Sequence, residues 1–217
     1  MRGFDSILIK MNRVLALLVS TLVANVMVLA QERMPPIPPE KMTDAQKKAA
    51  QDYKDLRNQT LGGGPWGVIL RVPDLMVPSV QFRIHNQKNS ALTPKLTEFA
   101  ILIAARHWTN NYEFIPHSAA AAKDGLSPEV IAAIVDGRRP EKMSEDEQAV
   151  YDFCDELLHN QSVTDATYAR MLAKFGEPGI VEAASLEGYY TYLSMLMNVA
   201  RTPVPPGSKP PLTPFPK

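Results

Sequence analysis

The sequence predicts an all-α fold, and two observations lead to that prediction. Apolar residues recur at helical spacing through most of the chain, and no segment shows the strict alternation of a half-buried strand. Helix-starting residues such as Ser and Thr, and helix-ending Gly, punctuate the apolar segments. With 45% hydrophobic and 21% charged residues among 217, the composition is that of a globular protein with one good core.

The first 30 residues have the features of a secretory signal. Arg13 gives a short basic start after Met11, and an apolar run covers residues 14–29. We expect cleavage after Ala30 and therefore an exported protein, periplasmic or extracellular. An uncleaved anchor is the alternative, but the run is shorter than the roughly 20 residues that span a bilayer comfortably. Met11 is a plausible true start, because Asp5 suits such a signal poorly.

Two proline-rich segments flank the region that we expect to be helical. Residues 31–42 hold four prolines and are expected to form an extended linker. Residues 203–217 hold seven prolines and cannot continue a helix, so we expect an extended tail, either free or strapped over a neighbour. The helical domain between them covers residues 43–202.

The first helix is expected over residues 43–57, a polar segment capped by Thr43 or Asp44. The glycine-rich stretch 61–67 follows and is expected to be a loop. It contains a literal GxGxxG, but no strand precedes it and Pro65 would obstruct a phosphate cradle. We therefore do not read this stretch as a nucleotide site.

The next two helices are expected from about residue 72 to 87 and over residues 94–108. The first of these should be interrupted or restarted near Pro78. The second begins after Thr93 with proline at the first helical position, and its middle is apolar on all sides. We expect this second helix to be buried.

The helix over residues 112–125 starts after a break at Asn110 and ends at Gly125, a residue suited to the left-handed end of a helix. Pro116 lies inside it. The sequence therefore predicts either a late start, near Glu113, or a kink at the proline.

The remaining helices follow three capping signals. A short helix covers residues 128–137, and a capping box at Ser144 opens a helix that carries the single cysteine, Cys154, on its apolar face. Cys154 has no partner for a disulfide and is expected to be a small buried hydrophobe. A helix over 165–176 precedes the last one, 179–200, which is apolar nearly all round. Such a helix is deeply buried or lies in an oligomer interface, and we favour the interface in part.

The charge pattern argues against nucleic acid as a partner. The chain has 23 basic and 23 acidic residues, a formal net charge of zero, and no block of like charge. Phosphate backbones are bound by clustered Lys and Arg, which this sequence lacks.

One polar cluster is a candidate for chemistry. Glu98 lies in an apolar helix, so it is either at an edge or held by a partner. Glu113 and His117 share a helix face at i,i+4, and a helical hairpin through Asn110 would return that face toward Glu98. Three interpretations remain open: an acid–base site, a solvated pair on a helix surface, or half of a metal site. A metal would need further ligands, for which only Glu98 or His107 could serve.

The spacing Glu98-x11-Asn110-x2-Glu113-x3-His117 resembles that of the carboxymuconolactone decarboxylase and alkylhydroperoxidase D-like superfamily. Its peroxidase branch has two cysteines where Asn110 and Glu113 stand here. The stretch ARHWTNNYEFIPHSAAAAKDGLSPEVIAAIVDGRRP, residues 105–140, is similar to the decarboxylase-like branch, which typically has a tyrosine–glutamate pair before the histidine. The resemblance extends from about Gly62 to Pro206.

The resemblance implies an all-helical domain that assembles as a homotrimer or homohexamer, with sites between helices near subunit contacts. It also implies acid–base lyase chemistry, decarboxylation or isomerisation, on a small carboxylated or lactone compound, with neither an organic cofactor nor a metal. His117 would deliver a proton, Glu113 would orient or charge it, and Glu98 could exchange protons too. Four further residues are candidates for holding the substrate, the first two through its carboxylate: Arg106, Arg83, Asn110 and Trp108.

Two alternative functions follow from the same residues. The chain could be a non-catalytic oligomeric protein that keeps the fold and binds a small molecule. It could also have the peroxidase or antioxidant activity of the superfamily by a route without paired thiols, because it has neither cysteine of the peroxidase branch.

Overall fold

The computed structural model describes residues 31–88 and 90–214, and the segment from Met34 onward forms one compact unit. Within these ranges every regular element is a helix and there is no strand, so the all-α prediction is confirmed. The expected signal, residues 1–30, lies outside the described residues. No helix among those described is long and apolar enough to cross a membrane.

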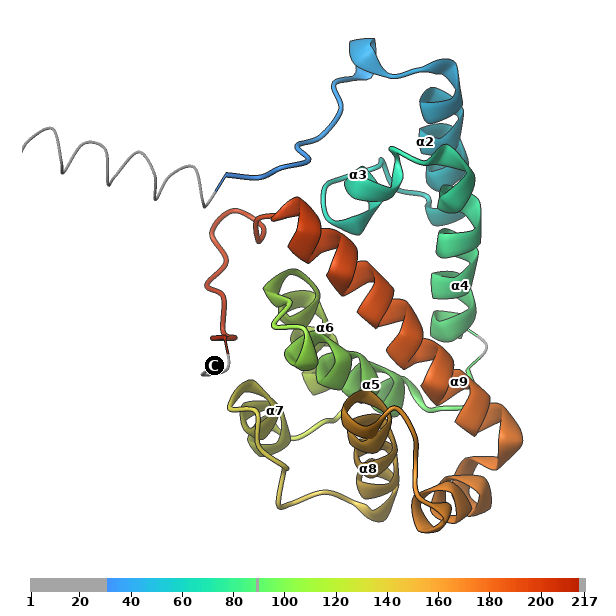
Figure 1. Ribbon diagram of the computed structural model, residues 1–217, viewed down its shortest axis with the longest axis vertical. Coiled ribbons are helices and arrows are strands. Elements are labelled where there is room, and N and C mark those ends of the chain that lie inside the picture. The colour runs from blue at the N-terminus through green and yellow to red at the C-terminus, as the bar shows by residue number, and fades with distance from the viewer. Residues whose placement is uncertain (1–30, 89, 215–217) are drawn as a thin grey trace, which may run out of the picture. The chain divides into compact units, whose positions relative to one another are not determined.

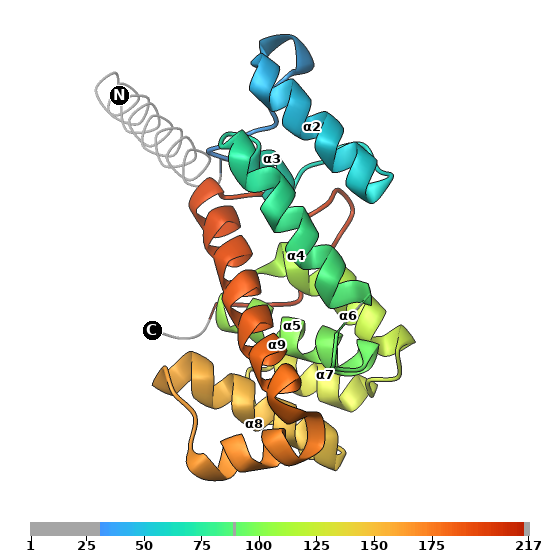
Figure 2. The same ribbon diagram turned by 90° about the vertical axis from the view of Figure 1, so that its right-hand side faces the viewer.

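Eight α-helices and two short 3₁₀ helices make up the described part of the chain (Figures 1 and 2). In chain order they are η1 (Pro39–Lys41), α2 (Asp44–Arg57), α3 (Pro65–Ile69), η2 (Pro73–Leu75), α4 (Met76–Lys88), α5 (Pro94–His107), α6 (Asn111–Lys123), α7 (Pro128–Val135), α8 (Glu145–Asn160) and α9 (Asp165–Ala200).

Side-chain caps define most helix starts, as the sequence predicts. In each case a hydroxyl or amide oxygen accepts a hydrogen bond from the backbone N–H three residues later, which satisfies a group that the helix leaves unpaired. The capping residues are Thr43, Thr93, Asn110, Ser127, Ser144 and Thr164. The reciprocal capping box predicted at Ser144 is present, and Thr43 forms a second one with Gln46.

Helix α5 is the centre of the core, packed against α6, α8 and α9. Phe99, Ala100 and Leu102 are fully buried, which explains why this helix is apolar on all sides. A charged residue in α5 therefore lies among packed helices and needs a partner, and this condition applies to Glu98.

Helix α9 bends sharply at Gly176, whose backbone is not helical (φ 65°, ψ −177°). Pro178 follows, so the two helices that the sequence predicts here meet at a glycine corner. Beyond the corner one face is buried, including Leu193 at 0% exposure, while Val181 on another face is 63% exposed. The helix is therefore buried on one side only.

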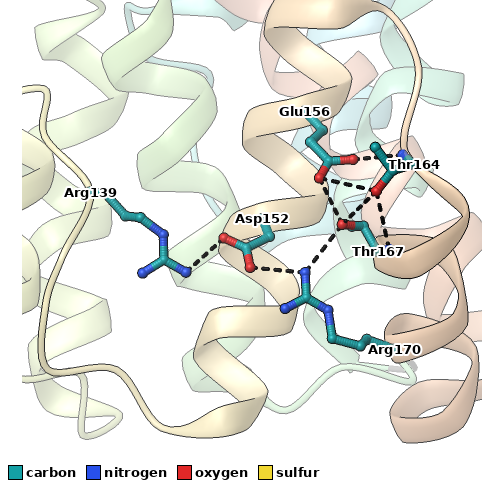
Figure 3. Close-up of polar contacts among 6 residues, drawn as sticks. All are labelled: Arg139, Asp152, Glu156, Thr164, Thr167 and Arg170. Atoms are coloured by element: carbon teal, nitrogen blue, oxygen red, sulfur yellow. Dashed lines mark hydrogen bonds and ion pairs between the residues drawn. The ribbon is translucent and has the colours of Figure 1, made fainter.

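A polar network joins α8 to the start of α9 (Figure 3). Asp152 accepts hydrogen bonds from Arg139 at 2.8 Å and from Arg170 at 2.9 Å. Glu156 accepts one from the backbone N–H of Thr164 at 2.7 Å. The contacts of Thr164 and Arg170 hold the turn and the start of α9 to α8, and that of Arg139 ties the segment before α8 to the same helix.

The prediction of a loop over residues 61–67 is wrong in its second half, because α3 begins at Pro65. Proline at the first helical position needs no hydrogen-bond donor, so the residue that argued for a loop begins a short helix. Gly64 precedes it with φ 69°, and a Cβ there would lie 2.4 Å from the ring of Tyr112. The glycine permits close contact between this turn and α6.

The proline-rich linker is more ordered than the sequence predicts, and the tail adopts the strapped one of its two predicted alternatives. The linker contains η1, and its Ile37 and Met42 pack against the core. The tail runs back over its own chain, where Leu212 is 4% exposed. Its N–H donates to Asn111 Oδ1 at 2.8 Å and its carbonyl accepts from Asn111 Nδ2 at 3.1 Å. The tail is thus strapped to the first residue of α6.

Candidate active site

The hairpin of α5 and α6 brings Glu98, Glu113 and His117 together, as the sequence predicts. Nδ1 of His117 lies 2.5 Å from Oε2 of Glu98, and Nε2 lies 3.3 Å from Oε2 of Glu113. One carboxylate comes from α5 and the other from the preceding turn of α6. The imidazole is therefore held between two carboxylates, one at each ring nitrogen.

Glu113 and His117 are buried, with side chains 6% exposed, and Glu98 is partly buried at 13%. Burial disfavours a charged imidazole, but the hydrogen bonds to Glu113 and Glu98 outweigh it and raise the pKa of His117 above its ordinary value. With an acceptor at each nitrogen, the ring is stabilised as an imidazolium that donates to both. The interpretation of Glu113 and His117 as a solvated surface pair is wrong.

The start of α6 fixes this geometry. The helix begins at Asn111, so the predicted late start near Glu113 is wrong, and the helix runs through Pro116. The side chain of Asn110 caps it by accepting from the backbone N–H of Glu113 at 3.2 Å. Asn110 is buried and does not line the cavity beside His117, so its position is that of a helix cap.

A cavity of about 220 Å³ adjoins the imidazole and both carboxylates. Arg83 of α4 lines it, and its Nη1 donates to the hydroxyl of Tyr190 at 3.2 Å. Burial works against the charged guanidinium, but Tyr190 and Glu113 hold the pKa of Arg83 above its ordinary value. The Tyr190 ring meets the His117 ring edge-on, with centroids 5.2 Å apart. Arg83 is thus the arginine that shares a cavity with the histidine.

Arg106 and Trp108, the other two expected substrate-binding residues, lie elsewhere. Nη1 of Arg106 donates to the carbonyl of Thr213 in the tail at 2.9 Å. Nε1 of Trp108 donates to Thr191 Oγ1 at 2.9 Å, which joins the end of α5 to α9. Neither residue lines the cavity beside His117.

Two residues that sequence reasoning missed belong to the site's surroundings. Tyr190 is buried on α9 and contacts both Arg83 and His117. Arg57, the last residue of α2, lies close enough to Arg83 that burial and this second guanidinium together lower the pKa of Arg57. No local pattern marks either residue, because each reaches the site from a helix distant in sequence.

The arrangement differs from that of a metal centre. Glu98 and Glu113 bind opposite nitrogens of one ring, so the three side chains do not converge on a common point. Among the residues that the structure describes, no group of three or more His, Cys, Asp or Glu side chains is placed to hold a metal ion.

Cys154 has the buried position that its helix face predicts, with 0% exposure. Burial and the neighbouring Glu187 raise the pKa of the thiol well above its usual range. Glu187 is buried too, and burial raises the pKa of its carboxyl to about 8. A thiol in this state is a poor nucleophile, because the thiolate is the reactive form.

Comparison with known proteins places the chain in no family: no family model matches it, and no curated protein matches it significantly. The resemblance stated from the spacing of Glu98, Glu113 and His117 therefore stays a prediction.

Proposed function

We propose that this protein is an exported, cofactor-independent acid–base lyase or isomerase of the carboxymuconolactone decarboxylase-like type. Its substrate is a small carboxylated or lactone compound. The supporting observation is the buried His117 ring between Glu98 and Glu113, with Arg83 lining the same cavity. A fixed proton donor beside a fixed cation is what such chemistry needs.

The charges of the site suit a substrate with one carboxylate. Glu98 and Glu113 are negative, whereas protonated His117, Arg83 and the nearby Arg57 are positive. Three positive and two negative groups leave one positive charge, which a single carboxylate neutralises. The Nη1 atom of Arg57 and the Nε atom of Arg83 are buried and have no hydrogen-bond partner among the described residues, and of the two arginines Arg83 lines the cavity.

Decarboxylation would proceed as follows. The bond between the carboxylate carbon and the substrate breaks and CO₂ leaves. The electron pair moves onto a conjugated lactone oxygen, where Arg83 stabilises the charge. The electron pair then returns to carbon, which takes a proton from Nε2 of His117. Nε2 is the nitrogen with the longer contact, 3.3 Å to Glu113 against 2.5 Å from Nδ1 to Glu98. Glu98 holds Nδ1 throughout, and solvent returns the proton to the ring. Isomerisation would use the same ring first as base and then as acid.

The test compares His117→Asn with His85→Asn in an assay for CO₂ release and isomerisation on a panel of small carboxylated lactones. His85 is a matched control, because it also contacts a glutamate, Glu182 at 3.2 Å, but is 53% exposed. We expect His117→Asn to lower kcat at least about 100-fold, since general acid catalysis typically contributes that much. His85→Asn should be unaffected. Equal activity of the two variants would contradict the role of His117.

A non-catalytic binding protein is the second candidate. It is favoured by the same geometry, because both nitrogens of His117 are already satisfied by carboxylates of the protein. In that case ligands would stabilise the wild type against heat more than His117→Asn, with no product formed. A thiol-independent peroxidase is a third candidate, and it requires hydroperoxide consumption that survives Cys154→Ser.

Export is part of the proposal and depends on residues 1–30. Protein recovered from the periplasm or culture medium of its native host should have the mass of a chain that begins at Gln31. A mass that includes the apolar run 14–29 would favour the anchor instead.

A further inference from the structure

A second cavity, of about 240 Å³, lies between the end of α5, the end of α7 and α8. It shares no lining residue with the cavity beside His117. His107, on its wall, is nine residues after Glu98 in the same helix, which corresponds to roughly 13 Å along the helix axis. The proposed lyase chemistry makes no use of this second cavity.

Basic side chains outnumber acidic ones around this cavity. Its walls include His107, His159, Arg106 and Arg138, against one acidic group, Asp155. Asp155 already contacts His159, with Oδ1 3.2 Å from Nδ1. The two arginines against one aspartate leave the cavity wall with one net positive charge, and protonation of either histidine adds to it.

The two histidines are close enough that a proton on one makes protonation of the other less favourable. Their rings meet edge-on with centroids 5.0 Å apart. Burial and His159 lower the pKa of His107, while Asp155 works in the opposite direction. A bound anion would relieve this repulsion, so the binding of an anion and the protonation of His107 favour each other.

The rest of the wall, apart from Gly137 and Tyr151, consists of aliphatic side chains. Ile103 and Ile134 are 6% and 3% exposed, and Leu158 lies beside them on the cavity wall. A fully hydrated inorganic anion gains nothing from such a surface, whereas an alkyl or aryl group does. A ligand that matches both the basic and the aliphatic residues of the wall has one anionic group and an apolar body.

We propose that this cavity is a binding site for a small monocarboxylate with an aliphatic or aromatic body. The carboxylate binds between His107 and Arg138, and the body packs on Ile134 and Leu158. This site is independent of the proposed lyase function and would exist whether or not the site at His117 is catalytic.

Adjacent arginines supply a matched pair of variants. Arg138 lines the cavity, and its ion pair with Asp136 at 3.2 Å is at the surface, where such pairs contribute little. Arg139 does not itself line the cavity; it bonds to Asp152 and stacks over the ring of Tyr151, a residue of the cavity wall, 5.5 Å from its centroid. Arg138→Ala removes a proposed ligand contact, and Arg139→Ala removes the same charge from the next residue.

The experiment is calorimetric titration of the purified protein at pH 6 with benzoate and hexanoate. Benzamide serves as the neutral counterpart and sulfate as the anion without an apolar body. We expect benzoate and hexanoate to bind, and benzamide and sulfate to bind at least about tenfold more weakly. Arg138→Ala and His107→Asn should each weaken benzoate binding about tenfold, the usual effect of losing one charge-assisted hydrogen bond. Arg139→Ala and His117→Asn should leave it unchanged.

Three outcomes would overturn the proposal. Benzoate could fail to bind to a protein that is folded by circular dichroism. Arg138→Ala and Arg139→Ala could weaken binding equally, which would indicate a diffuse charge effect. Binding could also be lost in His117→Asn and kept in Arg138→Ala, which would place benzoate in the cavity beside His117 and support the proposed function at the expense of this second site.

Discussion

At the scale of single residues, the distinctive feature is an imidazole that the protein holds in its charged form. His117 is buried, and burial alone would keep the ring neutral. The two carboxylates reverse that preference, so a charge that would be costly in the core becomes part of a satisfied network. The same contacts raise the pKa of the ring and tie its protonation to the stability of the fold.

The stability of the protein should therefore depend on pH through His117. Its folded pKa is raised above the unfolded value of about 6.5, so its contribution is complete below about pH 6.5 and is lost as pH rises through the folded pKa. In urea unfolding series from pH 6 to 9, we expect the free energy of unfolding to fall less steeply in His117→Asn than in the wild type.

Glu187 also makes the free energy of unfolding fall as pH rises, so its effect must be separated from that of His117. The pKa of its carboxyl is raised to about 8, so the unfolded chain releases a proton that the folded chain keeps. The slope from Glu187 remains in His117→Asn, and only the difference between the two proteins reports on His117. Parallel curves for both proteins would contradict the raised pKa of the histidine.

At the scale of elements, close contacts with two other segments of the chain position α6 and its two site residues. The turn before α3 abuts Tyr112, and the tail bonds to Asn111. Both contacts lie within two residues of Glu113. The start of α6 is thus supported by segments that are far from it in sequence.

Gly64→Ala should be destabilising by about 1–3 kcal/mol. The residue has φ 69°, which disfavours a side chain, and the new methyl group would overlap the ring of Tyr112. Gly62→Ala is the control, because a Cβ there meets nothing within 4 Å. Thermal unfolding of the two variants would measure the difference, and a similar loss in both would show that the contact with Tyr112 is unimportant.

Leu212→Ala should also be destabilising, by about 1–3 kcal/mol, because a buried side chain at 4% exposure is removed from the core. The more informative result is whether the substitution also loosens α6, which the tail contacts. Amide exchange should accelerate at the start of α6, where Asn111 binds the tail. Lys209→Ala, an exposed change in the same tail, should leave both measurements unaltered. Faster exchange confined to the tail would show that it does not support the helix.

At the scale of the whole molecule, the described part of the chain is a helical unit with α5 at its centre, and each site candidate lies along that helix. Glu98 faces α6, and His107 at its end faces α8. One buried helix thus contributes to two separate cavities, which is possible because residues nine apart point in nearly opposite directions.

The expected assembly into a trimer or hexamer is a prediction at this scale. The outer face of α9 exposes Val181 at 63% and Met195 at 44%. If this face is the interface, Val181→Asp and Met195→Asp should lower the mass measured by light scattering to that of a monomer. Leu56→Asp, which charges an apolar residue 40% exposed on α2, is the control. A monomeric wild type would contradict the expectation outright.

The sequence alone determined the helices, their caps and the hairpin that unites Glu98 with His117. These features depend on neighbours within about four residues or on the reversal of direction at one turn, so local pattern predicts them. The prediction failed at Pro65, which begins a helix instead of a loop. For the proline-rich tail the sequence left two alternatives, free or strapped down, and the buried Leu212 decides for the second.

Which arginine lies beside the histidine depends on how distant helices pack. Arg83 and Arg106 are both helical arginines near the motif in sequence, yet Arg83 lines the cavity and Arg106 bonds to the tail. The placement of Arg83, like the contact of Tyr190 with His117, depends on how α4 and α9 pack around α5. The packing of distant helices depends on how their buried faces fit together across the whole core. No short stretch of sequence predicts that fit.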